Sequence, residues 1–275
     1  MRWVERDGLR WLEADLGGAR AAFTTRMGGV GKPPAEGLDL GYREGTPPAA
    51  VRENRRLLAG ALGIEPGQVL SARQVHGAEL EIHNGPRPSA AAGGQSAAAD
   101  GQVSRSAAAI PMVLVADCLP VALYGPGSDA DDALATNVPG GVDARATVAM
   151  LHCGWRGLAA GIVAEGVAAT GATRAAIGPG IGACCFEVGD EVRERFADLA
   201  GRPGPDGSHT PLKRGRHLDL PEVAERLLRR AGVESIERAG ICTSCSPSLF
   251  YSYRRDGADT GRQAGLAWLE RWSRG

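Results

Sequence analysis

Leu151-His-Cys-Gly-Trp-Arg-Gly-Leu158 joins a predicted strand to a predicted helix. The apolar run 147–151 indicates a buried strand, and residues 158–165 indicate a helix. Loops at strand ends hold side chains rigidly and leave them reachable, so His152 is well placed for chemistry. A core histidine with a satisfied hydrogen bond is the alternative interpretation.

The composition limits the classes of protein that fit. A chain of 275 residues suits one large domain or two small ones, with a substantial core. The formal net charge of -1 gives no electrostatic case for a nucleic-acid partner. No apolar run reaches the roughly 18 residues of a membrane-spanning helix, and the N-terminus carries charges where a signal peptide would be apolar. We therefore expect a soluble cytoplasmic protein without a membrane partner.

The remaining segments predict a mixed α+β fold. No clean βαβ repeat supports a doubly wound sheet, and residues 260–272 fit either a helix or a strand. Low-complexity segments near 86–99 and 125–144 predict flexible loops rather than domain boundaries, because strand-like runs resume on both sides. We expect strands at 20–26, 68–74, 110–116, 119–124, 174–177, 236–242 and 249–253, and helices at 48–62, 188–199 and 221–231.

Three potential metal ligands follow strand-like runs: His76, Cys118 and His152. A His₂Cys set is a catalytic zinc arrangement that leaves the fourth position to water. Such a metal lowers the pKa of its bound water to about 7. The alternative is a nucleophilic pair of Cys118 with one of the histidines.

Six cysteines in a chain of this length do not form a disulfide scaffold. In a reducing cytoplasm they are thiols or metal ligands, and most fit small buried hydrophobic positions. The pair in Cys242-Thr-Ser-Cys245 has no second pair at zinc-ribbon spacing, because Cys184 and Cys185 are adjacent. We interpret this pair as structural.

Two arginine clusters, Arg55-Arg56 and Arg254-Arg255-Asp256, are candidates for anion binding, because guanidinium groups make paired contacts with phosphate. Solvated surface charge is the alternative. The segment Gly178-Pro-Gly-Ile-Gly182 fits a tight turn better than a dinucleotide loop, because Cys185 stands where the last glycine should be.

From about residue 20 onward, the chain resembles the YfiH/YlmD family, also called the laccase-domain or polyphenol-oxidoreductase family. The motifs that carry the resemblance occur in family order along the chain. They include Thr24-Thr-Arg26, Gln74-Val-His-Gly77, Ala99-Asp100, Ala116-Asp-Cys118, His152 through Gly157, Ile177-Gly-Pro179, Cys242-Thr243 and Tyr253-Arg-Arg-Asp-Gly257.

The resemblance implies one α+β domain, spanning residues 1–275, of stacked mixed sheets flanked by helices. It implies a zinc site formed by His76, Cys118 and His152, with copper as the alternative metal. Five histidines in the whole chain are too few for the copper centres of a multicopper oxidase.

The activity implied by the resemblance is phosphorolysis of purine nucleosides: adenosine, inosine, guanosine and methylthioadenosine. Adenosine deamination is implied as a second activity, so the expected small-molecule partners are a nucleoside and phosphate. The alternatives are a hydrolase that edits peptidoglycan precursors, a copper-dependent polyphenol oxidase, and a binding protein without turnover.

Several residue roles follow as hypotheses within this resemblance. Cys118, Asp117 and Arg55 are the expected catalytic residues, with Asp117 orienting a ligand or moving a proton. Arg55, with Arg26 behind it, is the candidate for phosphate binding. Trp155 would stack on the base, with a packed core tryptophan as the alternative.

Two residues depart from the family pattern. Cys153 stands where alanine is usual, which puts a second thiol beside a metal ligand. Phe186 replaces a common tyrosine, so we do not expect a role that needs this hydroxyl.

Overall fold

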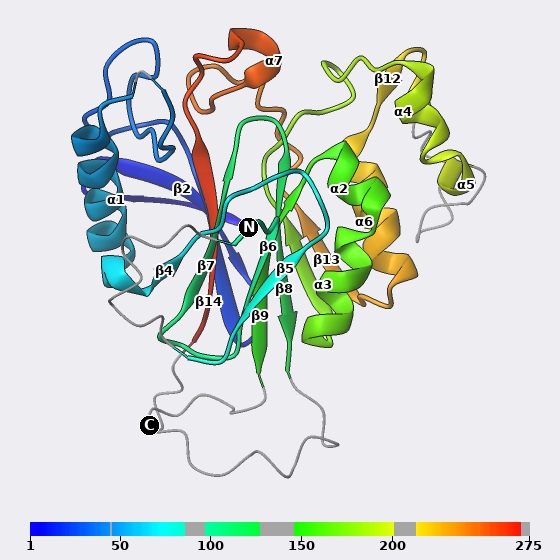
Figure 1. Ribbon diagram of the computed structural model, residues 1–275, viewed down its shortest axis with the longest axis horizontal. Coiled ribbons are helices and arrows are strands. Elements are labelled where there is room, and N and C mark those ends of the chain that lie inside the picture. Colours follow the sequence, from blue (N-terminus) through cyan, green and yellow to red (C-terminus); the bar gives the residue numbers. More distant parts are fainter. Residues whose placement is uncertain (45, 86–96, 127–145, 201–212, 271–275) are drawn as a thin grey trace.

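Strand β9 (Thr147–Cys153) lies inside the molecule, and every one of its residues is buried. The computed structural model describes residues 1–44, 46–85, 97–126, 146–200 and 213–270 (Figure 1). Strand β8 (Leu119–Gly125) pairs antiparallel with β9 and is also buried throughout. Both strands are continuously apolar because their sheet is covered on both faces.

The sheet that contains β8 and β9 has six strands in the order β13-β10-β8-β9-β6-β5. Its inner pairs are antiparallel, whereas β10–β13 and β5–β6 are parallel. The sheet is therefore mixed. The other four strands are β5 (Leu80–His83), β6 (Gly101–Ser104), β10 (Arg174–Ile177) and β13 (Ser235–Arg238).

The second six-stranded sheet has the order β1-β2-β3-β14-β7-β4. Strand β14 lies between β3 and β7, so the tail segment that fitted either a helix or a strand is a central strand. The strands are β1 (Arg2–Arg6), β2 (Leu9–Asp15), β3 (Ala19–Thr24), β4 (Val69–Leu70), β7 (Ile110–Val115) and β14 (Gln263–Leu269). A separate ladder joins β11 (Lys213–Arg214) to β12 (His217–Leu218).

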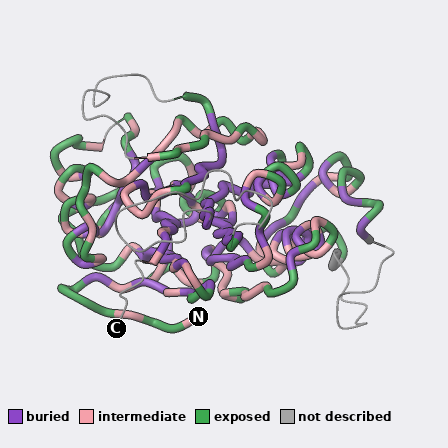
Figure 2. The backbone as a smooth tube through the Cα atoms, turned by 90° about the horizontal axis from the view of Figure 1, so that it is seen from below, coloured by how far each residue is buried: buried purple, intermediate pink, exposed green. Residues whose placement is uncertain are grey.

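The two sheets pack face to face, and helices cover their outer faces (Figure 1). Phe23 and Met150, from opposite sheets, belong to one apolar cluster between them, and buried residues fill the middle of the molecule (Figure 2). This arrangement confirms the predicted α+β fold of stacked mixed sheets. Helix α1 (Pro48–Leu62) packs on the sheet that contains β14. The sheet that contains β9 is covered by three helices, α2 (Trp155–Ala160), α3 (Ile162–Thr170) and α6 (Leu220–Arg230). The shorter helices are η1 (Pro66–Gln68), α4 (Asp190–Glu194), α5 (Ala197–Ala200) and α7 (Tyr253–Asp256).

Several predicted boundaries were wrong. The helix after the central turn begins at Trp155 and is divided at Gly161, whose φ of 96° ends α2 and starts α3. The predicted strand 68–74 is reduced to β4, and the predicted helix 188–199 is divided into α4 and α5. The predicted strand 249–253 is not a strand; α7 begins at its last residue.

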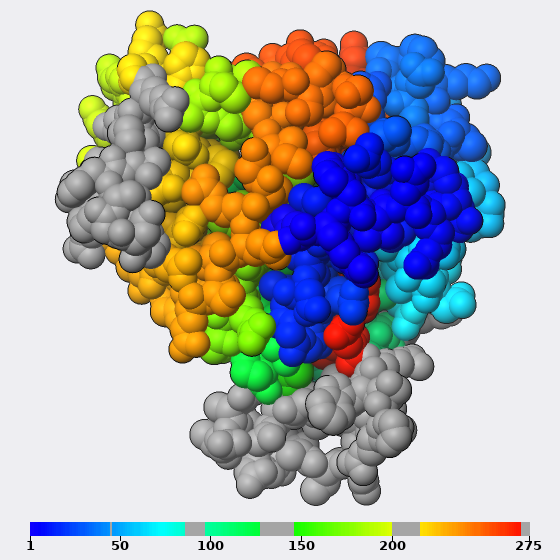
Figure 3. All heavy atoms as spheres, turned by 180° about the vertical axis from the view of Figure 1, so that it is seen from behind, coloured from blue at the N-terminus to red at the C-terminus, as the bar shows by residue number. Residues whose placement is uncertain are grey.

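The N-terminal hairpin of β1 and β2 was not anticipated from the sequence. It lies against the segment that follows α6, where the Met1 amino group pairs with the Glu237 carboxylate (Figure 3). Most of the two predicted flexible loops, residues 86–96 and 127–145, falls outside the described residues. Within the described part of the chain, no helix combines the length and apolar character needed to cross a bilayer.

Candidate metal centre and pocket

His76, Cys118 and His152 meet at one end of the β8–β9 pair. Their potential ligand atoms all lie within 4.8 Å of one another, and the two imidazole rings are 4.8 Å apart at 75°. His152 is buried, Cys118 is partly buried and His76 is exposed. The three predicted ligands thus form one group that solvent can reach from the side of His76.

Strand pairing brings Cys118 to His152. Pro120 lies opposite His152 in the β8–β9 ladder, so the turn before β8 places Cys118 beside the end of β9. A Cβ atom at Gly154 would lie only 2.9 Å from the Cys118 sulfur. The glycine that follows the histidine motif is therefore required by the close approach of the thiol.

Asp100 organises both histidines from a completely buried position. Its carboxylate accepts hydrogen bonds from the backbone N–H of Val75, His76 and Gly77 at 2.7–3.1 Å, and lies 2.8 Å from Nδ1 of His152. This contact leaves Nε2 of His152 available as a metal ligand. The loop that carries His76 is held in a left-handed conformation, with φ of 62° at His76.

The electrostatic environment favours a thiolate at Cys118. Burial alone would raise the pKa of this thiol, but the charge of His152 and hydrogen bonds from His152 and His76 lower it to about 6. Burial opposes the charged form of His152, but Cys118 and Asp100 raise its pKa to about 9. Burial also tends to raise the pKa of Asp100, and the hydrogen bonds from His152 and the backbone lower it to about 2.

Cys153 belongs to the apolar core rather than to the metal centre. Successive side chains of a strand point to opposite faces of the sheet. Cys153 accordingly packs with Leu119 and Leu158 in the cluster under the helices, and it is fully buried. Burial raises the pKa of its thiol, so the cysteine that departs from the family pattern stays protonated.

Asp117 lies beside Cys118, but its carboxylate is already occupied by protein donors. One oxygen accepts the hydroxyl of Thr243 at 2.6 Å and the other accepts the backbone N–H of Arg254 at 2.7 Å. Its backbone has a φ of 88°, which is uncommon for a residue other than glycine. These contacts suit a residue that positions the Cys118 turn.

A cavity of about 700 Å³ opens over the three ligands, a volume typical of sites for small organic molecules. Arg254 lies over the ring of Phe186, 5.3 Å from its centroid. The cavity therefore combines potential metal ligands with cationic and aromatic side chains. Besides the ligands and Asp117, its lining includes Tyr42, Arg43, Arg73, Gln74, Leu114, Arg156, Ile181, Phe186, Tyr253, Arg254 and Arg262.

The predicted substrate-binding residues Arg55, Arg26 and Trp155 do not line this cavity. The guanidinium of Arg55 donates two hydrogen bonds to the carbonyl of Leu40 and lines a neighbouring cavity of about 340 Å³. Arg26 lies over the ring of Tyr251 and contacts two backbone carbonyls. Trp155 packs against the core beneath the helices, which favours its structural interpretation.

The sequence left several features of the molecule without an assigned role. Asp100 lay within a family motif, but no role was assigned to it. Arg262 also lay within a family motif, Thr260-Gly-Arg262, without an assigned role, and Arg43 carried no signal. Arg254 was a candidate for anion binding and lies in the cavity. Within the described residues, a second group of potential metal ligands is formed by four cysteines, which the sequence spacing did not connect.

The fold and the site together define a class: a two-sheet α+β protein with a His₂Cys centre at the floor of a cavity. The family model described as "Multi-copper polyphenol oxidoreductase laccase" matches residues 20–136 and 142–270. The chain belongs to this family, the laccase or YfiH family, as its motifs predicted.

Relatives of known name cover nearly the whole chain. Purine nucleoside phosphorylase YfiH of Escherichia coli is 36% identical over 258 residues, which are 92% of this chain and 94% of the relative. Purine nucleoside phosphorylase SCO2081 of Streptomyces coelicolor is 36% identical over 266 residues, covering 93% and 97%. The crystal structure of YlmD from Geobacillus stearothermophilus superposes with a TM-score of 0.78 at 30% identity, covering 98% of each chain.

Proposed function

We propose that this protein is a zinc-dependent purine nucleoside phosphorylase, with adenosine deamination as a second activity. The observation that carries the proposal is the His76–Cys118–His152 group at the floor of a cavity lined by arginines and aromatic rings. The names of relatives about 36% identical over more than nine tenths of the chain support the same activity. We further propose that residues 1–275 form one catalytic domain, because both sheets contribute to one core.

The donor set fits zinc. Two imidazoles and one thiolate are the ligands of a known type of catalytic zinc site that leaves one position open. A zinc ion held by these residues would supply a Lewis acid and would lower the pKa of a bound water. In this chain, Asp100 fixes the ring of His152 and the loop of His76, and Asp117 holds the turn that carries Cys118.

Phosphate binding is better assigned to Arg254 and Arg262 than to Arg55 and Arg26. Arg254 and Arg262 line the cavity that contains the metal ligands. Each of these two arginines uses one Nη atom for hydrogen bonds to backbone carbonyls. A guanidinium carries five N–H donors, so further donors can meet an anion. Phosphate held there would lie in the same cavity as the nucleoside. One of its oxygens would bond to the anomeric carbon of the ribose as the glycosidic C–N bond breaks and the purine leaves.

The purine ring would stack on a cavity tyrosine rather than on Trp155. Tyr42 and Tyr253 line the cavity and are 52% and 56% exposed. Arg55 lies over one face of the Tyr42 ring, 4.8 Å from its centroid, so a base would stack on the other face of Tyr42 or on Tyr253. Stacking would place the purine across the opening, above the metal ligands.

The decisive experiment follows the products formed from adenosine with and without phosphate. We expect adenine and ribose 1-phosphate only when phosphate is present, and neither product from Cys118→Ala. Inosine as the sole product would replace the phosphorylase assignment with a deaminase. Equal turnover by wild type and Cys118→Ala would reject both activities for this site.

A further inference from the structure

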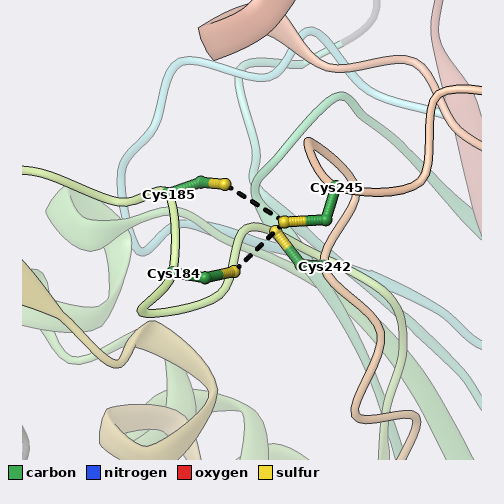
Figure 4. A group of neighbouring side chains, drawn as sticks. All are labelled: Cys184, Cys185, Cys242 and Cys245. Carbon is green, nitrogen blue, oxygen red and sulfur yellow. Dashed lines mark hydrogen bonds between the residues drawn. The ribbon is translucent and has the colours of Figure 1, made fainter.

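Four cysteines meet outside the cavity, on two loops that are far apart in the sequence. Cys184 and Cys185 follow β10, whereas Cys242 and Cys245 follow β13 (Figure 4). All four sulfur atoms lie within 4.8 Å of one another. Cys245 is central, because its sulfur lies 3.4 Å from that of Cys184 and 3.3 Å from that of Cys185.

The separations suit one metal ion better than a disulfide. Four thiolates around zinc at about 2.3 Å form a tetrahedron whose sulfur–sulfur edges are about 3.8 Å. A disulfide requires about 2.05 Å between one pair of sulfur atoms. Cys245 stands at almost the same distance from two possible partners, so the arrangement does not select one disulfide.

The backbone around the cysteines supports a charged sulfur cluster. The N–H of Gly182 donates to the sulfur of Cys242 at 3.3 Å, a contact that strengthens as the sulfur becomes negative. The guanidinium of Arg255 donates to the carbonyls of Thr243 and Ser244, between the two cysteines of the second loop. This guanidinium is also paired with both carboxylate oxygens of Asp256, so its contribution is to order the second loop. With zinc and four thiolates the site would carry a net charge of about -2.

Strand pairing explains why the two loops meet. Strands β10 and β13 are parallel neighbours, so the loops after them leave the same edge of the sheet. The pairing continues beyond the strands, because the N–H of Thr243 donates to the carbonyl of Gly180 at 3.0 Å and the N–H of Gly180 donates to the carbonyl of Ile241 at 3.3 Å. These two bonds form a parallel bridge between Gly180 and Cys242.

We propose that Cys184, Cys185, Cys242 and Cys245 bind one zinc ion through four thiolates, forming a second and closed metal site. A soft, tetrahedral four-sulfur site favours zinc. With all four positions filled by protein, the site has a structural role and binds no substrate. Binding replaces four thiol protons by the ion, and it changes no oxidation state.

This site braces one wall of the cavity. Thr243 lies between two of the proposed ligands, and its hydroxyl holds the carboxylate of Asp117. On the other loop, Phe186 follows Cys185 and lines the cavity. The ion would therefore join the two loops that position Asp117 and Phe186.

The test is the zinc content of the full chain, purified without an affinity tag under reducing conditions after growth with zinc. We expect two zinc ions per chain in wild type, one in Cys184→Ser/Cys245→Ser and one in Cys118→Ala. Ser248→Ala, a small change on the same loop as Cys245, serves as the matched control and should retain two. The two sites are counted independently, so failure at the His₂Cys centre leaves the four-cysteine result readable.

A second measurement does not depend on the folding of the double variant. X-ray absorption at the zinc edge of Cys118→Ala, whose four-cysteine group is intact, should give four sulfur neighbours at about 2.3 Å. Zinc-free Cys118→Ala, or a nitrogen-containing shell in that variant, would overturn the proposal. Disulfides among the four cysteines, detected by mass spectrometry of freshly purified wild type, would also overturn it.

Discussion

The described part of the chain contains two groups of side chains that could hold a metal ion, and they differ in what surrounds them. The His76–Cys118–His152 group offers three ligands, a carboxylate behind the histidines and a cavity in front. The four-cysteine group offers four ligands, and the backbone N–H of Gly182 donates a hydrogen bond to one of its sulfur atoms. Three ligands leave a position for chemistry, whereas four close the shell. On this ground we propose a catalytic role for the first group and a structural role for the second.

The largest expected effect follows removal of the thiol at the open centre. Cys118→Ala should lower phosphorolysis more than a hundredfold, because losing a direct ligand costs more than the ten- to hundredfold typical of outer-shell partners. The midpoint of thermal unfolding should also fall, because the variant loses an ion that binds the folded chain. Steady-state kinetics and thermal unfolding check this, with His83→Gln as the control for a histidine outside the centre. Activity above a tenth of wild type would contradict the assignment.

Asp100→Asn should have the next largest effect, a ten- to hundredfold loss of zinc affinity at the open centre. The amide can still accept hydrogen bonds, but it no longer offers a carboxylate to Nδ1 of His152 and the three backbone N–H groups. Competition with a chromophoric chelator measures the affinity. The four-cysteine site should keep its zinc, and simultaneous loss of both ions would instead indicate unfolding.

Arg254→Gln should raise the KM for phosphate about tenfold or more, the value of one charge-assisted hydrogen bond. Arg55→Ala should leave that KM unchanged and lower the free energy of unfolding by about 1–3 kcal/mol, because the carbonyl of Leu40 loses its donor. Phosphate titrations at saturating nucleoside, together with urea unfolding, distinguish the two arginines. A raised phosphate KM in Arg55→Ala would restore the assignment made from the sequence.

The smallest effect on turnover is expected at the closed site. Cys184→Ser/Cys245→Ser should lower kcat only severalfold, because its ion acts on the cavity through Thr243 and Asp117. The thermal unfolding midpoint should fall clearly, because the two loops lose their common ion. Loss of activity as complete as in Cys118→Ala would place the four-cysteine group in the chemistry itself.

The sequence was informative where local pattern and chemistry coincide. His76, Cys118 and His152 follow apolar runs, and β8 and β9 are apolar enough to be recognised without partners. The four-cysteine group could not be predicted, because it depends on the parallel pairing of β10 with β13. The adjacent Cys184 and Cys185 also match no familiar zinc spacing.

The roles of the arginines also depend on tertiary packing that the sequence does not reveal. Arg55 lies in a helix that was predicted correctly, yet the packing of that helix turns its guanidinium to Leu40. Arg262 immediately precedes β14, whose central place in the sheet was not evident from a tail that fitted two kinds of structure. The role of such a residue can be assigned only when the fold shows where its side chain lies.

One measurement tests most directly whether the open centre performs the chemistry and the closed one does not. It follows the products from adenosine, with and without phosphate, in wild type, Cys118→Ala and Cys184→Ser/Cys245→Ser preparations of known zinc content. We expect phosphate-dependent adenine and ribose 1-phosphate from wild type and, more slowly, from the double variant, and none from Cys118→Ala. Phosphorolysis by Cys118→Ala at more than a tenth of the wild-type rate would contradict the assignment of the His76–Cys118–His152 centre.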